Sequence, residues 1–342
     1  MELMHIYMRI ILIVSNLLQV SAWFHASNLL LSGSKSYLTY TDSVAAGLAK
    51  GMQECRSNFY WDRWNCPENS LSSFYKHKPS REMSYVHAIS AAGIMYVLTK
   101  NCSEGAFLKC GCDDSKTGEV DENGWMWGGC SDNIKFGEKI SKQFMDTVEV
   151  DSDANSLMNL HNNEAGRKAV RSTLEKRCKC HGVSGSCTLQ TCWTQLSDFS
   201  TIGRFLRKKY LTASQVDLSR GHLTQSNDFM EVEGDTLAPS KRDLVFLDES
   251  PDYCKTNDTI GYSGMVGREC IKKSAIDPTV KDEDAISWLK TSCSRLCRSC
   301  GLKVKKERVV ESSNCNCKFM WCCSVKCDQC TKRVTKYTCQ PE

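Results

Sequence analysis

The stretch Cys178-Lys-Cys-His-Gly-Val-Ser-Gly-Ser-Cys-Thr-Leu-Gln-Thr-Cys192 holds four cysteines and two glycines within fifteen residues, with Ser184 near its middle. Six residues lie between its second and third cysteines, which is the length of a short loop. Gly182 and Gly185 supply the backbone freedom that a tight loop needs. The stretch therefore predicts a short loop flanked by closely spaced cysteines.

Two nested bridges, Cys178–Cys192 and Cys180–Cys187, would cross-link the arms of a hairpin just below this loop. Opposed residues in a regular antiparallel ladder keep a constant index sum, whereas these two pairs sum to 370 and 367. We therefore expect a bulge between the bridges. Ser184 would stand on a rigid loop, available for catalysis, modification or contact with a partner.

The chain has 342 residues and 22 cysteines, an even number that a reducing cytosol would leave as reactive thiols. This count is typical of a secreted protein framed by disulfides. A mostly apolar run, Met8–Val20, precedes Ser21-Ala22 and predicts a cleaved signal peptide over residues 1–22, with a signal anchor as the alternative. No later stretch is long and apolar enough to cross a bilayer.

Composition changes near residue 250. Residues 251–342 hold 12 of the 22 cysteines and 17 Lys+Arg against 11 Asp+Glu, whereas the preceding residues carry a small negative net charge. We expect a helical N-terminal domain over 23–250 that carries the hairpin 178–192, and a small cysteine-rich domain of β-hairpins over 251–342. The predicted fold class is α+β and disulfide-rich.

Apolar residues recur at helical spacing in two segments of the N-terminal part. They predict one helix through Val44, Leu48, Met52, Cys55 and Phe59, and a second, capped by Ser80, through Tyr85, Ile89, Ala92 and Tyr96. Further helices are predicted at about 132–148, 153–176 and 193–209. We interpret the polar, aperiodic residues 211–240 as a mobile loop, and Trp125 and Trp127 as core residues.

The C-terminal part is too rich in cysteine for a conventional core, so we expect short strands pinned by bridges. Pairing Cys315 with Cys330 and Cys317 with Cys327 gives index sums of 645 and 644, and the adjacent Cys322 and Cys323 at the tip sum to 645. Six cysteines allow fifteen pairings, so this hairpin, 315–330, is a preference among them. Its tip carries apolar side chains with little beneath them, which predicts a partner: Phe319, Met320, Trp321 and Val325.

Two kinds of chemistry compete with these interpretations. The residues Gly182-Val-Ser-Gly-Ser186 depart from the Gly-x-Ser-x-Gly of a nucleophile elbow, and nothing suggests a third group to orient His181, so we expect no serine catalysis. Cys297/Cys300 and Cys327/Cys330 have zinc-ligand spacing. Disulfides compete for the same sulfurs in an exported chain, and we expect neither a metal nor a cofactor.

Two further features concern the surface. Asn101-Cys-Ser and Asn257-Asp-Thr are N-glycosylation triplets, expected on exposed turns. The basic residues Lys303, Lys305, Lys306 and Arg308 indicate a solvated face or, as the alternative, attraction to sulfated glycans such as heparan sulfate. We expect no nucleic-acid partner.

Motifs along nearly the whole chain resemble those of the Wnt family of secreted signalling proteins, and most closely its Wnt-eight subgroup. The matching motifs are Cys180-His-Gly-Val-Ser-Gly-Ser-Cys187, Thr191-Cys-Trp193, Trp64-Asn-Cys-Pro67, Gly128-Gly-Cys-Ser-Asp132, Asn159-Leu-His-Asn-Asn163, Cys315-Asn-Cys-Lys-Phe319, Trp321-Cys-Cys323 and, for the subgroup, Tyr37-Leu-Thr-Tyr-Thr41 and Phe319-Met-Trp-Cys-Cys-Ser-Val-Lys-Cys327.

This resemblance implies a glycosylated, non-enzymatic developmental ligand of the extracellular space and matrix. It implies a palmitoleoyl ester on Ser184, added by a membrane-bound O-acyltransferase and shielded by a lipid carrier during secretion. It implies that the thumb-like hairpin 178–192 and the finger-like hairpin 315–330 grip the cysteine-rich domain of a Frizzled receptor, and that an LRP-type co-receptor joins to stabilise β-catenin. The implied receptor contacts are His181, Gly182, Val183, Ser184, Gly185, Phe319, Met320, Trp321, Cys322, Cys323 and Val325.

The resemblance also implies a complete set of bridges. It agrees with the four pairings above and adds Cys322–Cys323, Cys55–Cys66, Cys102–Cys110, Cys112–Cys130, Cys254–Cys300, Cys270–Cys293 and Cys297–Cys339. The alternative from a different class is an extracellular disulfide-rich binding module that works without lipid.

Overall fold

The computed structural model contains two compact units. It describes residues 34–67, 78–122, 124–149, 151–219, 221–225, 238–258, 261–273, 276, 283–321 and 324–341. The predicted signal peptide 1–22 and the Cys322–Cys323 pair lie outside these residues. The first unit comprises Met1–Asn58 and Ser70–Ser250, and the second comprises Phe59–Asn69 and Pro251–Glu342. The α+β, disulfide-rich fold class is confirmed.

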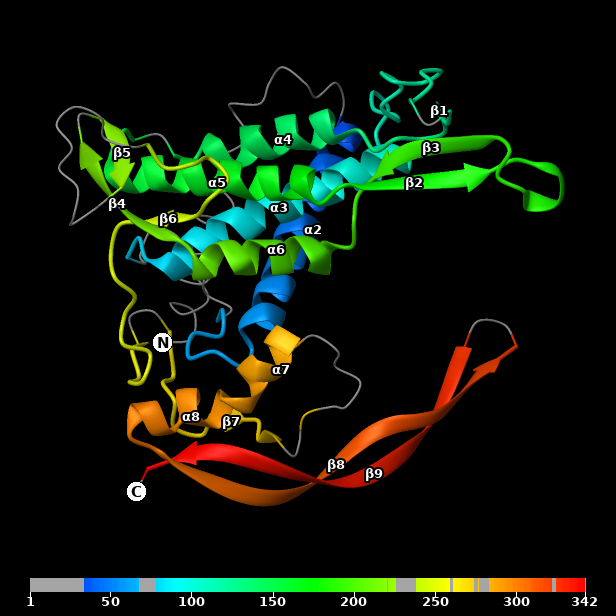
Figure 1. Ribbon diagram of the computed structural model, residues 1–342. Helices are drawn as coiled ribbons and strands as arrows, with labels where there is room; N and C mark the ends of the chain where they lie inside the picture. The colour runs from blue at the N-terminus through cyan, green and yellow to red at the C-terminus, as the bar shows by residue number, and fades with distance from the viewer. Residues whose placement is uncertain are drawn as a thin grey trace, which may run out of the picture. The chain divides into compact units, whose positions relative to one another are not determined.

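The first unit is a helical body built around α3. Its helices are α2 (Ser34–Phe59), α3 (Arg81–Ser103), α4 (Ile134–Asp146), α5 (Ala154–Ser172) and α6 (Phe199–Leu211). Helix α3 lies among the other four (Figure 1) and is buried around most of its circumference. The apolar faces predicted for α2 and α3 lie in the core, where Tyr85, Ile89 and Ala92 are fully buried.

Helices α2 and α3 approach closely because glycines face each other. A Cβ atom built on Gly47 would lie 2.5 Å from the Cα of Ile94, and one built on Gly93 would lie 2.3 Å from the carbonyl oxygen of Gly47. Both neighbours are backbone atoms, which cannot move aside as a side chain can. Glycine is therefore required at both positions, because a side chain would collide with the backbone of the facing helix.

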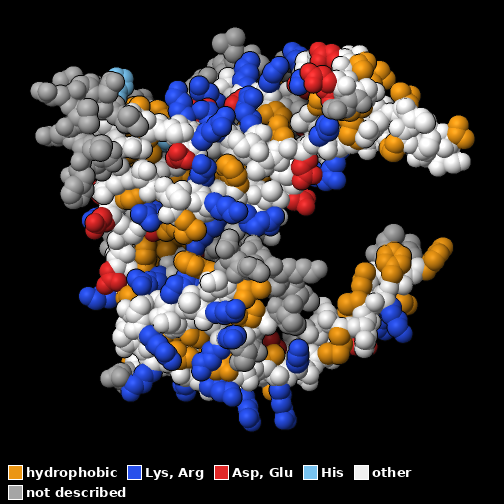
Figure 2. Space-filling view, viewed as in Figure 1, with side chains coloured by type: hydrophobic (Ala, Val, Ile, Leu, Met, Phe, Trp, Pro, Cys, Tyr) orange, Lys and Arg blue, Asp and Glu red, His pale blue; other side chains and the backbone are white. Residues whose placement is uncertain are grey.

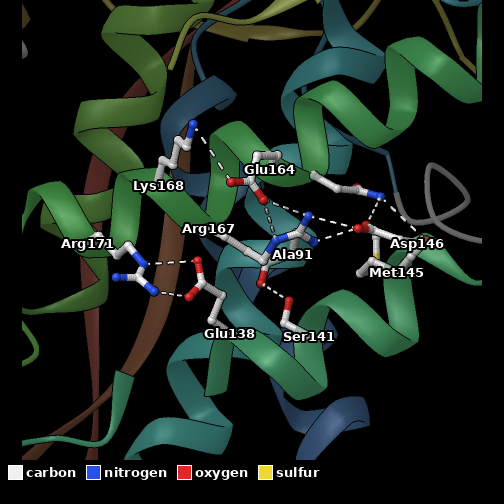
Figure 3. Close-up of polar contacts among 10 residues, drawn as sticks. Ala91, Glu138, Ser141, Met145, Asp146, Glu164, Arg167, Lys168 and Arg171 are labelled. Carbon is white, nitrogen blue, oxygen red and sulfur yellow. Dashed lines mark hydrogen bonds and ion pairs between the residues drawn. The ribbon is translucent and has the colours of Figure 1, made fainter. Parts of the chain in front are cut away.

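A buried arginine links α4 to α5 (Figure 3). The Arg167 side chain is 1% exposed and donates to both carboxylate oxygens of Asp146, at 3.0 and 2.9 Å, and to Glu164 at 3.0 Å. One turn away, Arg171 pairs with Glu138, but its side chain is 44% exposed. The two pairs thus join the same helices in different environments.

The structure differs from two of the segments predicted for the first unit. Residues 193–195 end strand β3 (Gln190–Gln195), and α6 begins only at Phe199. The segment 211–240, expected to be a mobile loop, contains β4 (Ser214–Ser219) and β5 (His222–Gln225). Strand β4 pairs with β5 and with β6 (Val245–Phe246), and its residue Val216 is fully buried in a small cluster. A single buried apolar residue was too weak a signal to reveal this strand.

The second unit is a long two-stranded ribbon on a small disulfide core. It contains β7 (Glu269–Cys270), α7 (Glu283–Lys290), α8 (Ser292–Leu296), β8 (Lys303–Met320) and β9 (Ser324–Gln340). Apart from the two-residue β7, which pairs with β9, the short strands that we predicted are instead two strands of 18 and 17 residues. The core beneath the ribbon holds buried sulfur: Cys270, Cys293, Cys297 and Cys339.

Residues 59–69 belong to this second unit, although we had placed them in a continuous N-terminal domain. The guanidinium of Arg268 donates to the carbonyl oxygen of Tyr60 at 2.7 Å, and Arg295 donates to the Asp62 carboxylate at 3.1 Å. These bonds hold the segment against the second unit. The first unit ends at Ser250 and the second resumes at Pro251, which is the position of the predicted domain boundary.

Nine bridges coincide with nine of the eleven expected pairings, and Cys55 and Cys66 are disulfide-bonded as well. The nine are Cys102–Cys110, Cys112–Cys130, Cys178–Cys192, Cys180–Cys187, Cys254–Cys300, Cys270–Cys293, Cys297–Cys339, Cys315–Cys330 and Cys317–Cys327. In the described part of the chain, no helix has the length and apolar character that a membrane span requires.

The two arginine pairs give a matched stability test. Asp146→Ala leaves the buried Arg167 guanidinium paired only with Glu164 and removes the acceptors of two of its hydrogen bonds, which costs about 1–3 kcal/mol of unfolding free energy. Glu138→Ala disrupts the more exposed pair and should cost about 0.5 kcal/mol. Chemical denaturation of the secreted variants measures both values, and equal losses would contradict the assigned roles.

A buried histidine predicts the acid sensitivity of the helical unit. His87 on α3 is 3% exposed, and burial lowers its pKa from 6.5 to about 4. The folded chain thus binds fewer protons than the unfolded chain between these values, so stability falls as pH is lowered through this window, by up to about 3 kcal/mol. His87→Gln should flatten the stability profile between pH 4 and 6.5, and an unchanged slope would argue against this assignment.

Candidate functional site

The hairpin 178–192 is a regular two-stranded ladder. Strand β2 (Glu175–Cys180) pairs antiparallel with β3, and every opposed pair keeps the same register, including Cys178 with Cys192. The register continues where the His181 N–H donates to the Leu189 carbonyl at 2.8 Å. The predicted bulge between the bridges is therefore wrong. The offset of the Cys180–Cys187 bridge is absorbed beyond the ladder, in the loop itself.

The tip of this hairpin is a single 3₁₀ turn, Val183–Gly185. Ser184 has φ +59° and Gly185 has φ +77°, so both residues lie in the left-handed region. Gly182 has an ordinary φ of −73°, contrary to our expectation that its conformational freedom is used. Its N–H donates to the Ser186 carbonyl at 2.7 Å, and an added Cβ would lie 2.3 Å from that same oxygen. Glycine is needed there because the loop closes tightly.

Ser184 is exposed at this tip. Among the hydrogen bonds of the described residues, none joins its hydroxyl to the His181 ring. The neighbouring Val183 side chain is 90% exposed. Leu189, which we had not predicted as a contact residue, is 51% exposed on the second arm. Its position between two bridged cysteines, away from any core segment, is the sequence signal that could have revealed it. The hairpin therefore exposes the Ser184 hydroxyl and the Val183 and Leu189 side chains to solvent.

The far end of the β8–β9 ribbon forms the second hairpin. Its register shifts once, between Cys315 and Lys318, and Asn316 in this interval has φ +48°. Such an irregularity is typical of a β-bulge. Cys317 and Cys327 follow the register of the outer segment, and their Cα atoms are 4.0 Å apart. The ribbon end is thus cross-linked just below its tip, as the first hairpin is.

The outer end of this ribbon presents large apolar side chains to solvent. Trp321 is 96% exposed and Phe319 is 74% exposed. Phe319 lies opposite Val325, whereas Met320 lies opposite Ser324. Because side chains alternate between the faces of a strand, Met320 lies on the other face from Phe319 and Val325. Apolar side chains are visible at the ends of both hairpins in Figure 2.

The cysteines with zinc-ligand spacing form disulfide bonds. Cys297 pairs with Cys339 and Cys300 with Cys254, while the finger cysteines pair with each other across the ribbon. Within the described ranges, no group of three or more His, Cys, Asp or Glu residues is placed to hold a metal ion. The sulfur atoms of these cysteines are bonded in disulfides and are not free thiolates for a zinc ion.

The two glycosylation triplets lie in different surroundings. Asn257 is exposed in a turn and bridges to Tyr262, as expected. Asn101 lies within α3, is half-buried, and donates from Nδ2 to the Ser43 hydroxyl at 2.9 Å. The expectation of an exposed turn at Asn101 was therefore wrong, because the helix continues through the triplet to Ser103.

The predicted basic cluster is divided between the two faces of the β8–β9 ribbon. Lys305 pairs with Glu307 at 2.9 Å on one face. Lys306 and Arg308 are exposed on the other face, which follows from strand alternation. Binding of sulfated glycans remains a prediction.

These features define a class of protein. It is a disulfide-rich α+β chain with two units, each of which carries a hairpin that is cross-linked by disulfides and has exposed apolar side chains. The sequence of residues 30–340 matches the model of the Wnt family. The chain is 50% identical to mouse Wnt-8b over 96% of its length and 93% of that protein, and 49% identical to human Wnt-8a over 93% and 90%. A solved structure of human WLS in complex with WNT8A matches with TM-score 0.67 and 46% identity, covering 90% of this chain and 96% of that chain.

The chain therefore belongs to the Wnt family of signalling proteins.

The two tip glycines give a test of the loop geometry. Gly182→Ala forces a Cβ against the Ser186 carbonyl, whereas Gly185→Ala meets no atom within 4 Å and costs only the left-handed conformation, about 1–2 kcal/mol. We expect Gly182→Ala to lower the yield of correctly bridged Cys180–Cys187 more strongly than Gly185→Ala. Disulfide mapping of the secreted variants measures this yield. A similar yield for both would contradict the close approach at Gly182.

Proposed function

We propose that the chain is a secreted, palmitoleoylated glycoprotein ligand that binds the cysteine-rich domain of Frizzled receptors. In this proposal Ser184 carries the acyl ester and the hairpin 178–192 delivers it into a receptor groove. The observation that carries the proposal is the exposure of Ser184 at the tip of a doubly bridged hairpin with no core around it. An acyl chain there would extend away from its own protein.

The acyl chain explains why a rigid hairpin is useful. Each buried methylene group is worth roughly 0.8 kcal/mol, so a fatty chain that enters a fitted groove contributes strongly to affinity. The bridges reduce the conformational freedom that the loop would otherwise lose on binding. His181, Gly182, Val183 and Gly185 would contact the rim of the groove.

The second hairpin, 315–330, would grip another side of the same receptor domain. Phe319 and Val325 form one apolar face, and Trp321 stands at the tip. Aromatic side chains in such positions are typical binding hot spots. Met320 and the Cys322–Cys323 pair complete the proposed contact set. An LRP-type co-receptor would join this complex and activate β-catenin-dependent signalling in development.

Secretion of such a ligand requires an O-acyltransferase and a carrier that shields the lipid. The solved relative WNT8A forms a complex with WLS, and we propose a carrier of this kind for the present chain. The N-glycans at Asn101 and Asn257 and release to the extracellular matrix belong to the same route. The proposal assigns the chain no catalytic residue, metal or cofactor.

Two substitutions test the proposed contacts of the two hairpins with the receptor domain. Ser184→Ala touches no bridge, so the fold should persist while binding to the Frizzled domain falls by at least a hundredfold. Trp321→Ala should weaken binding about tenfold or more, with the acyl group retained. The matched control is Leu108→Ala, which removes a 94% exposed apolar side chain outside both hairpins.

Binding of the secreted variants to the isolated receptor domain measures these effects. Wild-type affinity for Ser184→Ala would contradict the lipid mechanism. Unchanged affinity for Trp321→Ala, or an equal loss for Leu108→Ala, would contradict the assignment of the finger.

A further inference from the structure

Strand β2 leaves one edge of its sheet open. The sheet has the order β1-β3-β2, with β1 (Met126–Trp127) on one side of β3 and β2 on the other (Figure 1). The outer side of β1 is covered, because Gly118 donates to the Trp127 carbonyl and the Trp127 N–H donates to Glu119, both at 2.8 Å. No comparable backbone bond covers the outer side of β2 in the described part of the chain.

The pattern of the ladder tells which backbone groups point outward. In an antiparallel pair, the N–H and C=O groups of successive residues point alternately to the two sides of the strand. The bond from His181 to Leu189 assigns the odd-numbered residues of β2 to the β3 side. The N–H and C=O groups of Lys176, Cys178 and Cys180 therefore point away from the sheet.

This open edge is already held in the conformation of a bound strand. Cys178 and Cys180 are each tied into a bridge, and the register of β2 with β3 is unbroken. An added strand would therefore meet backbone groups that lose little freedom on pairing, which favours binding.

The net charge along the edge is positive, with Lys176, Arg177 and Lys179 against Glu175. Lys176 extends its ammonium over the Trp125 ring, 4.1 Å from the centroid, and Arg177 pairs with Glu175 at 2.7 Å. Lys179 is exposed and forms no ion pair with any described residue. Lys179 pairs with Thr191 of β3, and Thr191 pairs in turn with Met126 of β1. Neither of these neighbours across the sheet carries a charge.

We propose that the outer edge of β2 binds an extended acidic peptide segment of a partner protein as a fourth strand. Carboxylates at alternate positions of that segment would lie opposite Arg177 and Lys179, on one face of the sheet. A second copy of this chain carries the same net positive edge, and a register that pairs Glu175 with Lys179 of the other copy places the two Arg177 side chains opposite each other, so an acidic segment is the better match. This inference does not depend on the acylation of Ser184.

Lysines also occur on edge strands simply to prevent pairing, and one titration separates the two roles. The probe is an eight-residue peptide of alternating glutamate and valine, added to the full secreted chain. Hydrogen exchange of the segment 175–180 should slow on binding. The same peptide methylated at alternate backbone nitrogens, or a lysine–valine peptide, should bind at least tenfold more weakly.

Variants of the chain locate the bound strand. Lys176→Pro removes an outward N–H without breaking the β2–β3 ladder, and Lys176→Ala is its control because it removes the same side chain and keeps the N–H. We expect Lys176→Pro to bind the acidic peptide at least fivefold more weakly than Lys176→Ala. Lys179→Glu should weaken the acidic peptide at least tenfold and strengthen binding of the lysine–valine peptide.

Three outcomes would overturn the proposal: equal binding of the methylated and unmethylated acidic peptides, no protection of 175–180, or an unchanged preference in Lys179→Glu. The methylated peptide and Lys179→Glu leave the β2 backbone intact, so the test stands even if Lys176→Pro does not fold. The Ser184→Ala chain should bind the acidic peptide as the wild type does, which separates this edge from the lipid-dependent function.

Discussion

Covalent cross-linking is the constraint on which both presented hairpins depend. An isolated two-stranded hairpin is at best marginally stable in water, because it has no second layer against which to bury a face. Here each hairpin end is crossed by two bridges, and the described residues beyond them are exposed, apart from the half-buried Gly182. The bridges hold the two strands of each hairpin together in place of a packed core. The apolar side chains at the tip can therefore remain exposed without being needed to stabilise the hairpin.

The helical unit supplies the base from which the first hairpin extends. Strand β2 follows α5 after two residues, and β3 leads into α6 after three. Helices α5 and α6 are fixed against α3, and α5 is joined to α4 through the buried Arg167 pair. The base of the hairpin is therefore positioned by contacts within the helical unit, at some distance from the tip.

The sequence predicted those parts of the structure that local patterns determine. The faces of α2 and α3 follow from apolar spacing, and Ser184 at a loop tip follows from the spacing of four cysteines. Spacing could not show that Ser184 adopts a left-handed conformation or that Gly182 is needed for space, because both depend on how the loop closes. It could not show that residues 59–69 join the second unit, since those contacts come from arginines more than 200 positions away. Index sums suggested the finger bridges, but the bulge at Asn316 is set by strand register.

Ser184, exposed at the tip of its hairpin, is the proposed attachment point for lipid. The most direct measurement is the mass of the peptide spanning Ser184, taken from secreted protein that is fully active in receptor binding. We expect this peptide to carry the added mass of one palmitoleoyl group on Ser184. An unmodified Ser184 in fully active protein would contradict this proposal, and would favour a disulfide-rich ligand that works without lipid.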